Sequence, residues 1–255
     1  MIESSYFLGA VVLETPKILK PKKSRVISTV LSPALQLWLR SQVQQVEALY
    51  FNIDGGDRQI LGGYIPGVSV AASGAVYQGL HLSQIELEGT DIRVNLSQVL
   101  KGKPLRLLEP VPVVGQLLLQ QTDLQTSLQS PLLSNALTEL LGTFLKSHGI
   151  TNLANDLKNQ PVNWQSINID DGQLTLSGTL TDASLQTTPV VIRAGLQLVT
   201  PHELLLNPLQ VQLHPDTLPL NFDGFQIDLG SDVALQELTL TQGQMICRGG
   251  LRVIP

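Results

Sequence analysis

The stretch LHLSQIEL, residues 80–87, carries the pattern from which the fold of this chain can be predicted. Successive side chains of a β-strand point to opposite faces, so a half-buried strand alternates apolar and polar residues. Leu80 and Leu82 follow this rule. Two polar residues, Ser83 and Gln84, then come together. In a regular strand, Ile85 and Leu87 would point to the face opposite to that of Leu80 and Leu82. One extra residue, a β-bulge, would restore the apolar residues to one face and bend the strand, whereas the alternative is two short strands joined by a tight turn.

The same interruption occurs twice more in the chain. VALQELTL, residues 233–240, has two polar residues between its apolar pairs. LLLNPLQVQL, residues 204–213, is broken by Asn207 and Pro208, and the bulge interpretation is weaker there because proline cannot donate a backbone hydrogen bond. Repeated interruptions of this kind predict a strongly curved antiparallel sheet with one apolar face.

The composition is rich in leucine and poor in charge. Of the 255 residues, 48 are Leu and 24 are Gln, and only 15% are charged. This length suits one large domain or two small ones. Leu-rich faces with uncharged polar backs suit a protein that buries more apolar surface than its own core requires, although a Leu-rich core alone gives the same composition.

Several function classes are disfavoured by the same numbers. A net charge of −5 and an aromatic content of 4% do not fit a nucleic-acid binder, which usually carries a basic stripe and stacking aromatic residues. The single Cys247 excludes an intramolecular disulfide, and no Cys/His cluster has the spacing of a zinc site, so we expect no metal and no cofactor.

The sequence also bears on location. The sequence contains no run of about 18 apolar residues, so it predicts no transmembrane helix. The beginning of the chain is not a secretory signal, because Glu3 precedes the apolar stretch and the basic residues follow it. We therefore expect a cytoplasmic protein, or one bound peripherally to the cytoplasmic face of a membrane.

Residues 1–31 form a basic N-terminal arm. Five of the sixteen basic residues of the chain lie here within nine positions: Lys17, Lys20, Lys22, Lys23 and Arg25. The arm is either a solvated tail or a segment attracted to anionic lipid headgroups, where each basic residue contributes about 1 kcal/mol. On the second interpretation, these five residues and Leu37 of the helix that follows form a membrane-docking surface.

Two amphipathic helices are predicted. Ser32-Pro33 is a favourable helix start, with serine as N-cap and proline at the first helical position. The apolar face that follows has helical spacing and comprises Leu35, Trp38, Leu39, Val43, Val46 and Leu49, while Leu37 lies on the polar back.

The second helix follows Ser130-Pro131, and a capping box is predicted just before it at Thr122 and Gln125. Its apolar face comprises Leu133, Leu137, Leu140, Leu141 and Phe144, and Gly149 ends it.

The chain has two similar halves in residues 32–115 and 122–255. Each runs from a Ser-Pro helix to an "NID" strand and a glycine turn, which suggests an internal duplication. Asp171-Gly172 and Gln242-Gly243 predict hairpin turns, and the proline-broken segment 101–121 predicts a linker with an edge strand. The predicted fold class is α+β: one domain over residues 32–255, with a long bent antiparallel sheet packed on the two helices.

No catalytic constellation is visible. The four histidines, His81, His148, His202 and His214, have no neighbours in sequence with catalytic or ligand spacing, and Asp170-Asp171 occupies a turn where aspartate is expected. Cys247 lies in an apolar strand and is expected to be an inert core residue. We therefore expect a protein that is not an enzyme.

Four motifs in a fixed order resemble the LmeA-like phospholipid-binding family of bacteria. The segment Val76-Tyr77-Gln78-Gly79-Leu80 is similar to that family's "vYqGLrLs" signature. It is followed by a Gly-Pro-Leu stretch at 102–105, by Asp123-Leu124 and by "LQSPLL" at 128–133. The resemblance covers roughly residues 45–240. It implies lipid binding, an architecture of the tubular lipid-binding type and no catalytic residues; envelope-located relatives carry a signal peptide, so location cannot be inferred from it.

The predicted function is non-enzymatic binding of phospholipid or another acyl lipid in an apolar groove, with the protein peripheral to a membrane. Candidate lining residues are Leu35, Trp38, Leu39, Val46, Leu133, Leu137, Leu140 and Phe144, and ordinary core packing is the alternative for each. A different function stays open: a structural or interaction protein that uses apolar surface or a sheet edge to oligomerise. The oligomeric state is not predicted.

Overall fold

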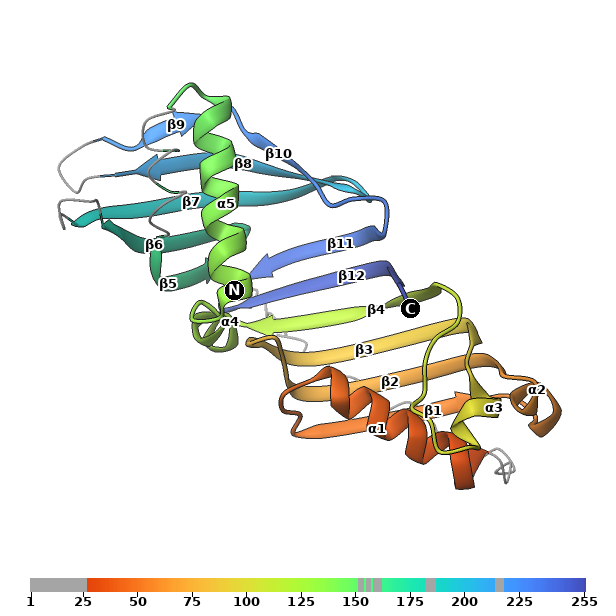
Figure 1. Cartoon of the computed structure of the whole chain (residues 1–255). Coiled ribbons are helices and arrows are strands. Elements are labelled where there is room, and N and C mark those ends of the chain that lie inside the picture. Colours follow the sequence, from red (N-terminus) through yellow and green to blue (C-terminus); the bar gives the residue numbers. More distant parts are fainter. Residues whose placement is uncertain (1–26, 151–153, 155–156, 158–161, 182–186, 214–217) are drawn as a thin grey trace, which may run out of the picture.

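The computed structural model describes residues 27–150, 154, 157, 162–181, 187–213 and 218–255. Within these residues the chain forms two antiparallel sheets of six strands each, together with a few helices, as Figure 1 shows. The predicted α+β class is therefore confirmed, with two sheets in place of the single one expected.

The first sheet joins strands from both ends of the chain. Its strand order is β1-β2-β3-β4-β12-β11, so the C-terminal hairpin lies beside β4. The strands are β1 (Ala48–Asp54), β2 (Tyr64–Tyr77), β3 (Leu80–Arg93), β4 (Val111–Gln120), β11 (Val233–Thr241) and β12 (Gln244–Val253). The prediction of a linker with an edge strand before residue 121 was wrong, because β4 lies between β3 and β12. The duplication stays a prediction, as does the single domain.

The second sheet is built from consecutive strands. Its order is β10-β8-β7-β6-β5, and β9 also pairs with β8. The strands are β5 (Asn163–Asp170), β6 (Gln173–Thr181), β7 (Thr187–Thr200), β8 (Glu203–Gln212), β9 (Leu220–Phe222) and β10 (Phe225–Asp228). Backbone hydrogen bonds from Leu235 to Pro201 and from Gly243 to Ile169 join the β11–β12 hairpin to this sheet.

The predicted hairpin turns are confirmed. Gly172 and Gly243, with φ of +71° and +76°, follow Asp171 and Gln242 in the turns of β5–β6 and β11–β12. In the turn between β2 and β3, Gln78 and Gly79 both have positive φ, as a two-residue type I′ turn requires.

Two of the three predicted bulges are present. The pairing of β11 with β12 shifts between Leu235 and Glu237, and the pairing of β7 with β8 shifts opposite Asn207 and Pro208. Both shifts lie where a pair of residues interrupts the apolar alternation. In β11 the extra residue keeps Leu235 and Leu238 on one face.

The bulge predicted in residues 80–87 is absent, because β2 and β3 pair without a shift over their whole length. Ser83 interrupts the alternation for another reason. Its hydroxyl accepts a hydrogen bond from the Gln120 backbone (2.8 Å) and donates one to the Asp123 carboxylate (2.5 Å). Leu82 packs on one core and Ile85 lies on the sheet face described below, so β3 uses both parities.

Five α-helices connect the strands of the described chain: α1 (Ser32–Gln42), α2 (Asp57–Leu61), α3 (Leu96–Val99), α4 (Gln121–Ser127) and α5 (Pro131–Ser147). A π-helical turn, η1 (Ile27–Leu31), precedes α1, so Ser32 is already helical and is not the N-cap that we predicted. Ser130 does cap α5, since its hydroxyl accepts the Leu133 backbone hydrogen bond.

The first helix is shorter than predicted. It ends at Gln42, and the next residues are extended because they pair with the end of β2: Gln44 donates to the Val76 carbonyl (2.7 Å) and Glu47 to the Ser73 carbonyl (3.1 Å). Val46, predicted on the apolar face of this helix, therefore lies outside it.

The capping box predicted for Thr122 and Gln125 was also wrong. The N-cap of α4 is Gln120, and the side chains of Gln121 and Gln125 instead reach the edge of β5 that pairs with no other strand. Gln121 accepts from the Ile169 backbone (2.8 Å), while Gln125 accepts from Ile167 (3.0 Å) and donates to the Gln165 carbonyl (2.7 Å).

Two separate hydrophobic cores result. The first core lies between α1, α2, α3 and one end of the first sheet, and its buried residues include Leu31, Leu35, Ile53, Ile60, Val68 and Val111. The second core lies under α5, which crosses the strands of the second sheet in Figure 1. Its buried residues include Phe144, Trp164, Ile169, Val190 and Leu209, together with Leu119 and Leu240 of the first sheet.

Candidate functional site

One face of the first sheet is apolar across all six strands. Residues paired directly across antiparallel strands point to the same face, so the pairing register defines rows of side chains. Three consecutive rows consist only of apolar residues and glycine: Leu238–Cys247–Leu117–Ile85–Ala72–Leu49, Leu235–Gly249–Gly115–Leu87–Val70–Phe51 and Val233–Leu251–Val113–Gly89–Val68–Ile53. We call this surface the apolar face.

The two cores cover the apolar face only in part. Ile53 and Val68 are buried in the first core, and Leu240 is buried in the second. Between them Ile85, Leu87 and other residues of β3, β4, β11 and β12 are half-buried. Leu251 is 44% exposed. A strip of hydrocarbon therefore lies at the surface in the middle of the sheet.

Two glycines limit how far side chains rise above this strip. A Cβ on Gly115 would overlap the Glu86 carbonyl oxygen and approach Leu87 Cδ2 to 2.7 Å. A Cβ on Gly249 would approach Leu235 Cα to 2.8 Å. The Leu87 side chain thus fills the space that a residue at position 115 would take, and the second row has no tall side chain in β4 or β12.

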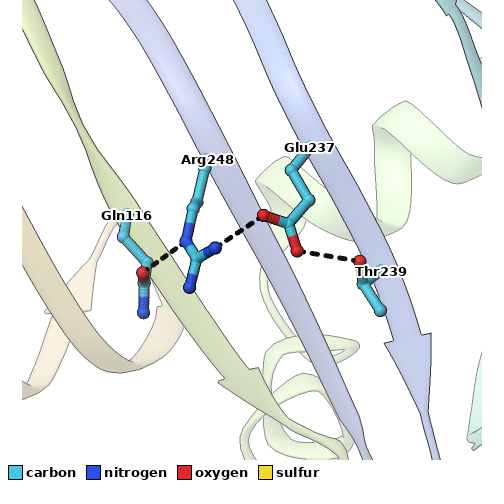
Figure 2. A network of polar contacts seen from close by, with 4 residues as sticks. All are labelled: Gln116, Glu237, Thr239 and Arg248. Carbon is cyan, nitrogen blue, oxygen red and sulfur yellow. Dashed lines mark hydrogen bonds and ion pairs between the residues drawn. The ribbon is translucent and has the colours of Figure 1, made fainter. Parts of the chain in front are cut away.

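The opposite face of the same sheet is polar. Figure 2 shows a chain of contacts from β4 to β11, in which Arg248 donates to Gln116 (2.6 Å) and forms an ion pair with Glu237 (2.7 Å). Thr239 donates to the same carboxylate (3.1 Å). This contrast between the two faces orients the sheet: water contacts the polar side, and the hydrocarbon strip lies on the other.

Burial affects the cysteine of the apolar face. Cys247 is half-buried between Leu117 and Leu238. Desolvation raises the pKa of its thiol to about 11, since burial disfavours the charged thiolate. The thiol is therefore protonated at neutral pH, which agrees with the expectation of an unreactive residue.

A separate, mixed pocket lies at the β2–β3 turn. It has a volume of about 330 Å³, and its lining includes Glu47, His81, Leu82 and Asp123. Gly74, at φ +56°, makes room for it, because a Cβ there would meet the Glu47 side chain. Asp123 is already bonded to Ser83, so the pocket presents both carboxylate and apolar groups.

The structure divides the predicted lining residues between the two cores. Leu35 is buried in the first core, and Trp38 and Leu39 pack against it. Phe144 is buried in the second core, and Leu133, Leu137 and Leu140 pack against it partly exposed. Val46 lines the mixed pocket instead. Seven of the eight residues are therefore split between the two cores, and the eight do not form one continuous lining.

Sequence reasoning missed the sheet residues of the site. Leu238 and Leu87 lie in segments whose apolar pattern was recognised, and Leu117 lies in the segment predicted as a linker with an edge strand, but only helix residues were selected as lining. The available signal was the series of apolar residues at alternate positions in VVGQLLLQ, residues 113–120, together with the similar series in VALQELTL.

The predicted docking residues fall into two groups. Leu37 is 72% exposed on α1. Lys17, Lys20, Lys22, Lys23 and Arg25 lie outside the described residues, so their docking role stays a prediction.

The histidines show no catalytic arrangement in the described part of the chain. The His148 ring contacts the rings of Phe144 and Phe222 at the end of α5, and His202 contacts the Val233 carbonyl. Nowhere among the described residues do three His, Cys, Asp or Glu side chains come together as a metal site would need. Likewise, the helices that the structure describes include none with the length and hydropathy of a membrane span.

Comparison with known proteins identifies a family. The chain matches the LmeA-like phospholipid-binding family over residues 22–250. The chain belongs to this family. The match includes the buried residues of both cores and nearly all of both sheets; of the apolar face, only Leu251 lies beyond it. Neither the curated proteins nor the solved structures gave a match.

Proposed function

We propose that the chain binds phospholipid or another acyl lipid without catalysing a reaction, and that the acyl chains lie on the apolar face. The observation that carries the proposal is the half-buried strip of leucine, isoleucine and valine between two separate cores, in a chain of the phospholipid-binding family. Burying hydrocarbon against it is favourable by about 0.8 kcal/mol per CH₂ group.

The dimensions of the face suit an acyl chain. Neighbouring strands lie about 4.8 Å apart, so a row across six strands spans roughly 24 Å. One leaflet of a bilayer has a hydrocarbon thickness of roughly 15 Å. A row is therefore long enough for an extended chain.

The proposal places the protein at a membrane surface from which it takes lipid. Polar groups of the lipid would remain in water at the margin of the face, and no described residue is assigned a chemical step. Phospholipid hydrolysis by the purified chain would contradict this non-enzymatic role.

The deciding experiment is native mass spectrometry of the protein purified without detergent, with lipid extraction of the same sample. We expect copurified phospholipid. Leu117→Gln should remove most of it, whereas Leu118→Gln should not. These neighbouring residues of β4 are both half-buried, but Leu118 belongs to the polar face and so is a matched control. Circular dichroism of both variants controls for folding.

A second measurement uses the unaltered chain, so that it does not depend on how a variant folds. Delipidated protein is alkylated at Cys247 with and without added phosphatidylglycerol. Lipid on the apolar face should slow alkylation at least tenfold. Equal rates, or an oligomer that never takes up lipid, would overturn the proposal and favour the structural or interaction role.

A further inference from the structure

The first sheet ends in a projection that we call the basic tip, formed by residues 57–63 and 96–109. Figure 1 shows α2 and α3 side by side at this end. Backbone hydrogen bonds join the two segments through the ends of β2 and β3: Val94 donates to Gly63 (2.9 Å) and Leu108 to Arg93 (2.9 Å).

A buried polar residue holds the tip in shape. Asn95 is 6% exposed. Its side-chain amide donates to the Pro104 carbonyl (3.0 Å), and its side-chain oxygen accepts from the Arg106 backbone (2.8 Å). These bonds close the loop between α3 and β4, so the residues at its surface are presented by a defined backbone.

The tip exposes apolar side chains that its own core does not need. Ile60, Leu96 and Leu105 are buried inside it. Leu61, Leu100 and Leu108, on the same segments, are 56%, 54% and 58% exposed. Single exposed leucines are ordinary on a protein surface, but here three fall on the two short segments that form the tip.

The same projection carries unpaired positive charge. Arg58, Lys101, Lys103 and Arg106 are exposed, and none forms an ion pair with another described residue. The acidic residues of these two segments are Asp57 and Glu109, so the tip is net positive in a chain whose net charge is −5.

A neighbouring arginine is already engaged and is not counted. Arg93 lies over the Tyr64 ring, 4.7 Å from its centroid. The Tyr64 hydroxyl donates to the Asp91 carboxylate (2.7 Å), and this hydrogen bond raises the pKa of Tyr64.

The geometry points to the basic tip as the surface that docks on an anionic phospholipid bilayer. Exposed leucines among unpaired basic residues are suited to the interface, where charge attracts the protein and apolar groups insert shallowly. The basic residues alone would be enough to bind an acidic protein. The three exposed leucines therefore favour a bilayer as the partner. This deepens the proposed function and rests on it. Of the three rows of the apolar face, the row on the side of the tip contains the exposed Leu251, where lipid would enter and leave.

The test is flotation of the full chain with phosphatidylcholine vesicles, with and without phosphatidylglycerol. Each basic residue at an anionic surface strengthens binding about fivefold, so K101Q/K103Q should weaken partitioning about 25-fold. L100Q/L108Q should weaken it about tenfold or more. The matched control K146Q/L132Q changes an exposed lysine and an exposed leucine of α5, and should stay within twofold of the parent.

The outcomes separate this inference from lipid binding itself. The tip variants should retain the copurified phospholipid of the parent chain, because they leave the apolar face unchanged. Parental flotation of both tip variants, equal binding to neutral vesicles, or an equal loss in the control would overturn the docking role. Absence of copurified lipid in the parent would instead overturn the proposed function.

Discussion

At the scale of single residues, the reactivity of Cys247 depends on its apolar neighbours. Leu117 and Leu238 lie beside it in neighbouring strands, and their hydrocarbon excludes water from the sulfur. The raised pKa, about 11, means that the reactive thiolate is scarce at neutral pH. A thiol that is physically half-accessible is therefore chemically quiet.

We predict that alkylation of Cys247 by iodoacetamide keeps accelerating with pH through 9 and levels off only near the pKa of about 11. Because the thiolate is the nucleophile, the rate at pH 7.4 should be about 100-fold below that of the chain unfolded in urea. Mass spectrometry of timed samples measures both rates. A plateau near pH 9 in the folded protein would show that the thiol is not desolvated.

At the scale of elements, α4 protects the edge of the second sheet. The edge strand β5 has backbone groups with no neighbouring strand, and Gln121 and Gln125, one helical turn apart, bond to three of them. Side-chain amides suit this role because each offers both a donor and an acceptor. The helix thereby replaces a seventh strand and joins the two sheets.

We predict that Gln125→Leu lowers the free energy of unfolding by about 1–3 kcal/mol, the usual cost of leaving a buried backbone donor unsatisfied. Urea denaturation measures this loss, and hydrogen exchange should accelerate at the Ile167 amide. Gln129→Leu, at an exposed position just beyond α4, is the control and should change stability by less than about 0.5 kcal/mol. Equal stability of the two variants would remove the role of α4 as an edge cover.

At the scale of the whole molecule, the two sheets share one organisation, with an apolar side that carries the helices and a polar side that faces water. The polar network of Figure 2 contributes little to stability, because both members of the Arg248–Glu237 pair are about half exposed. Its place opposite the hydrocarbon strip leaves one side of the first sheet suited to lipid and the other to solvent.

We expect the basic arm to add a second contact with the membrane. We predict that changing Lys17, Lys20, Lys22 and Lys23 to Gln weakens flotation with anionic vesicles while the fold stays intact. Binding of the parent should weaken with salt, since the Debye length falls from about 10 Å at 0.1 M to about 3 Å at 1 M. Flotation of the variant equal to that of the parent would leave the arm as a solvated tail, with docking left to the basic tip.

Several features followed from the sequence by itself because they depend on neighbours along the chain. The hairpin turn at Asp171-Gly172, the capped start of α5 at Ser130 and the bulge in β11 each have a local signal. The family also has a local signal, because its motifs occur in a fixed order along the chain. The alternation of apolar and polar residues likewise indicated a sheet with one apolar face, although it could not say which strands lie side by side.

Only the tertiary structure decided how these pieces meet. Pairing of β12 with β4 joins residues more than a hundred positions apart, and no local pattern specifies such a partner. The first helix ends at Gln42 because Val76 and Ser73 of β2 offer hydrogen bonds to the residues that follow, overriding their helical spacing. The proposed lipid site lies on the sheet and not on the predicted helix faces for the same reason: a continuous apolar surface depends on register between distant strands, and that register exists only in the folded chain.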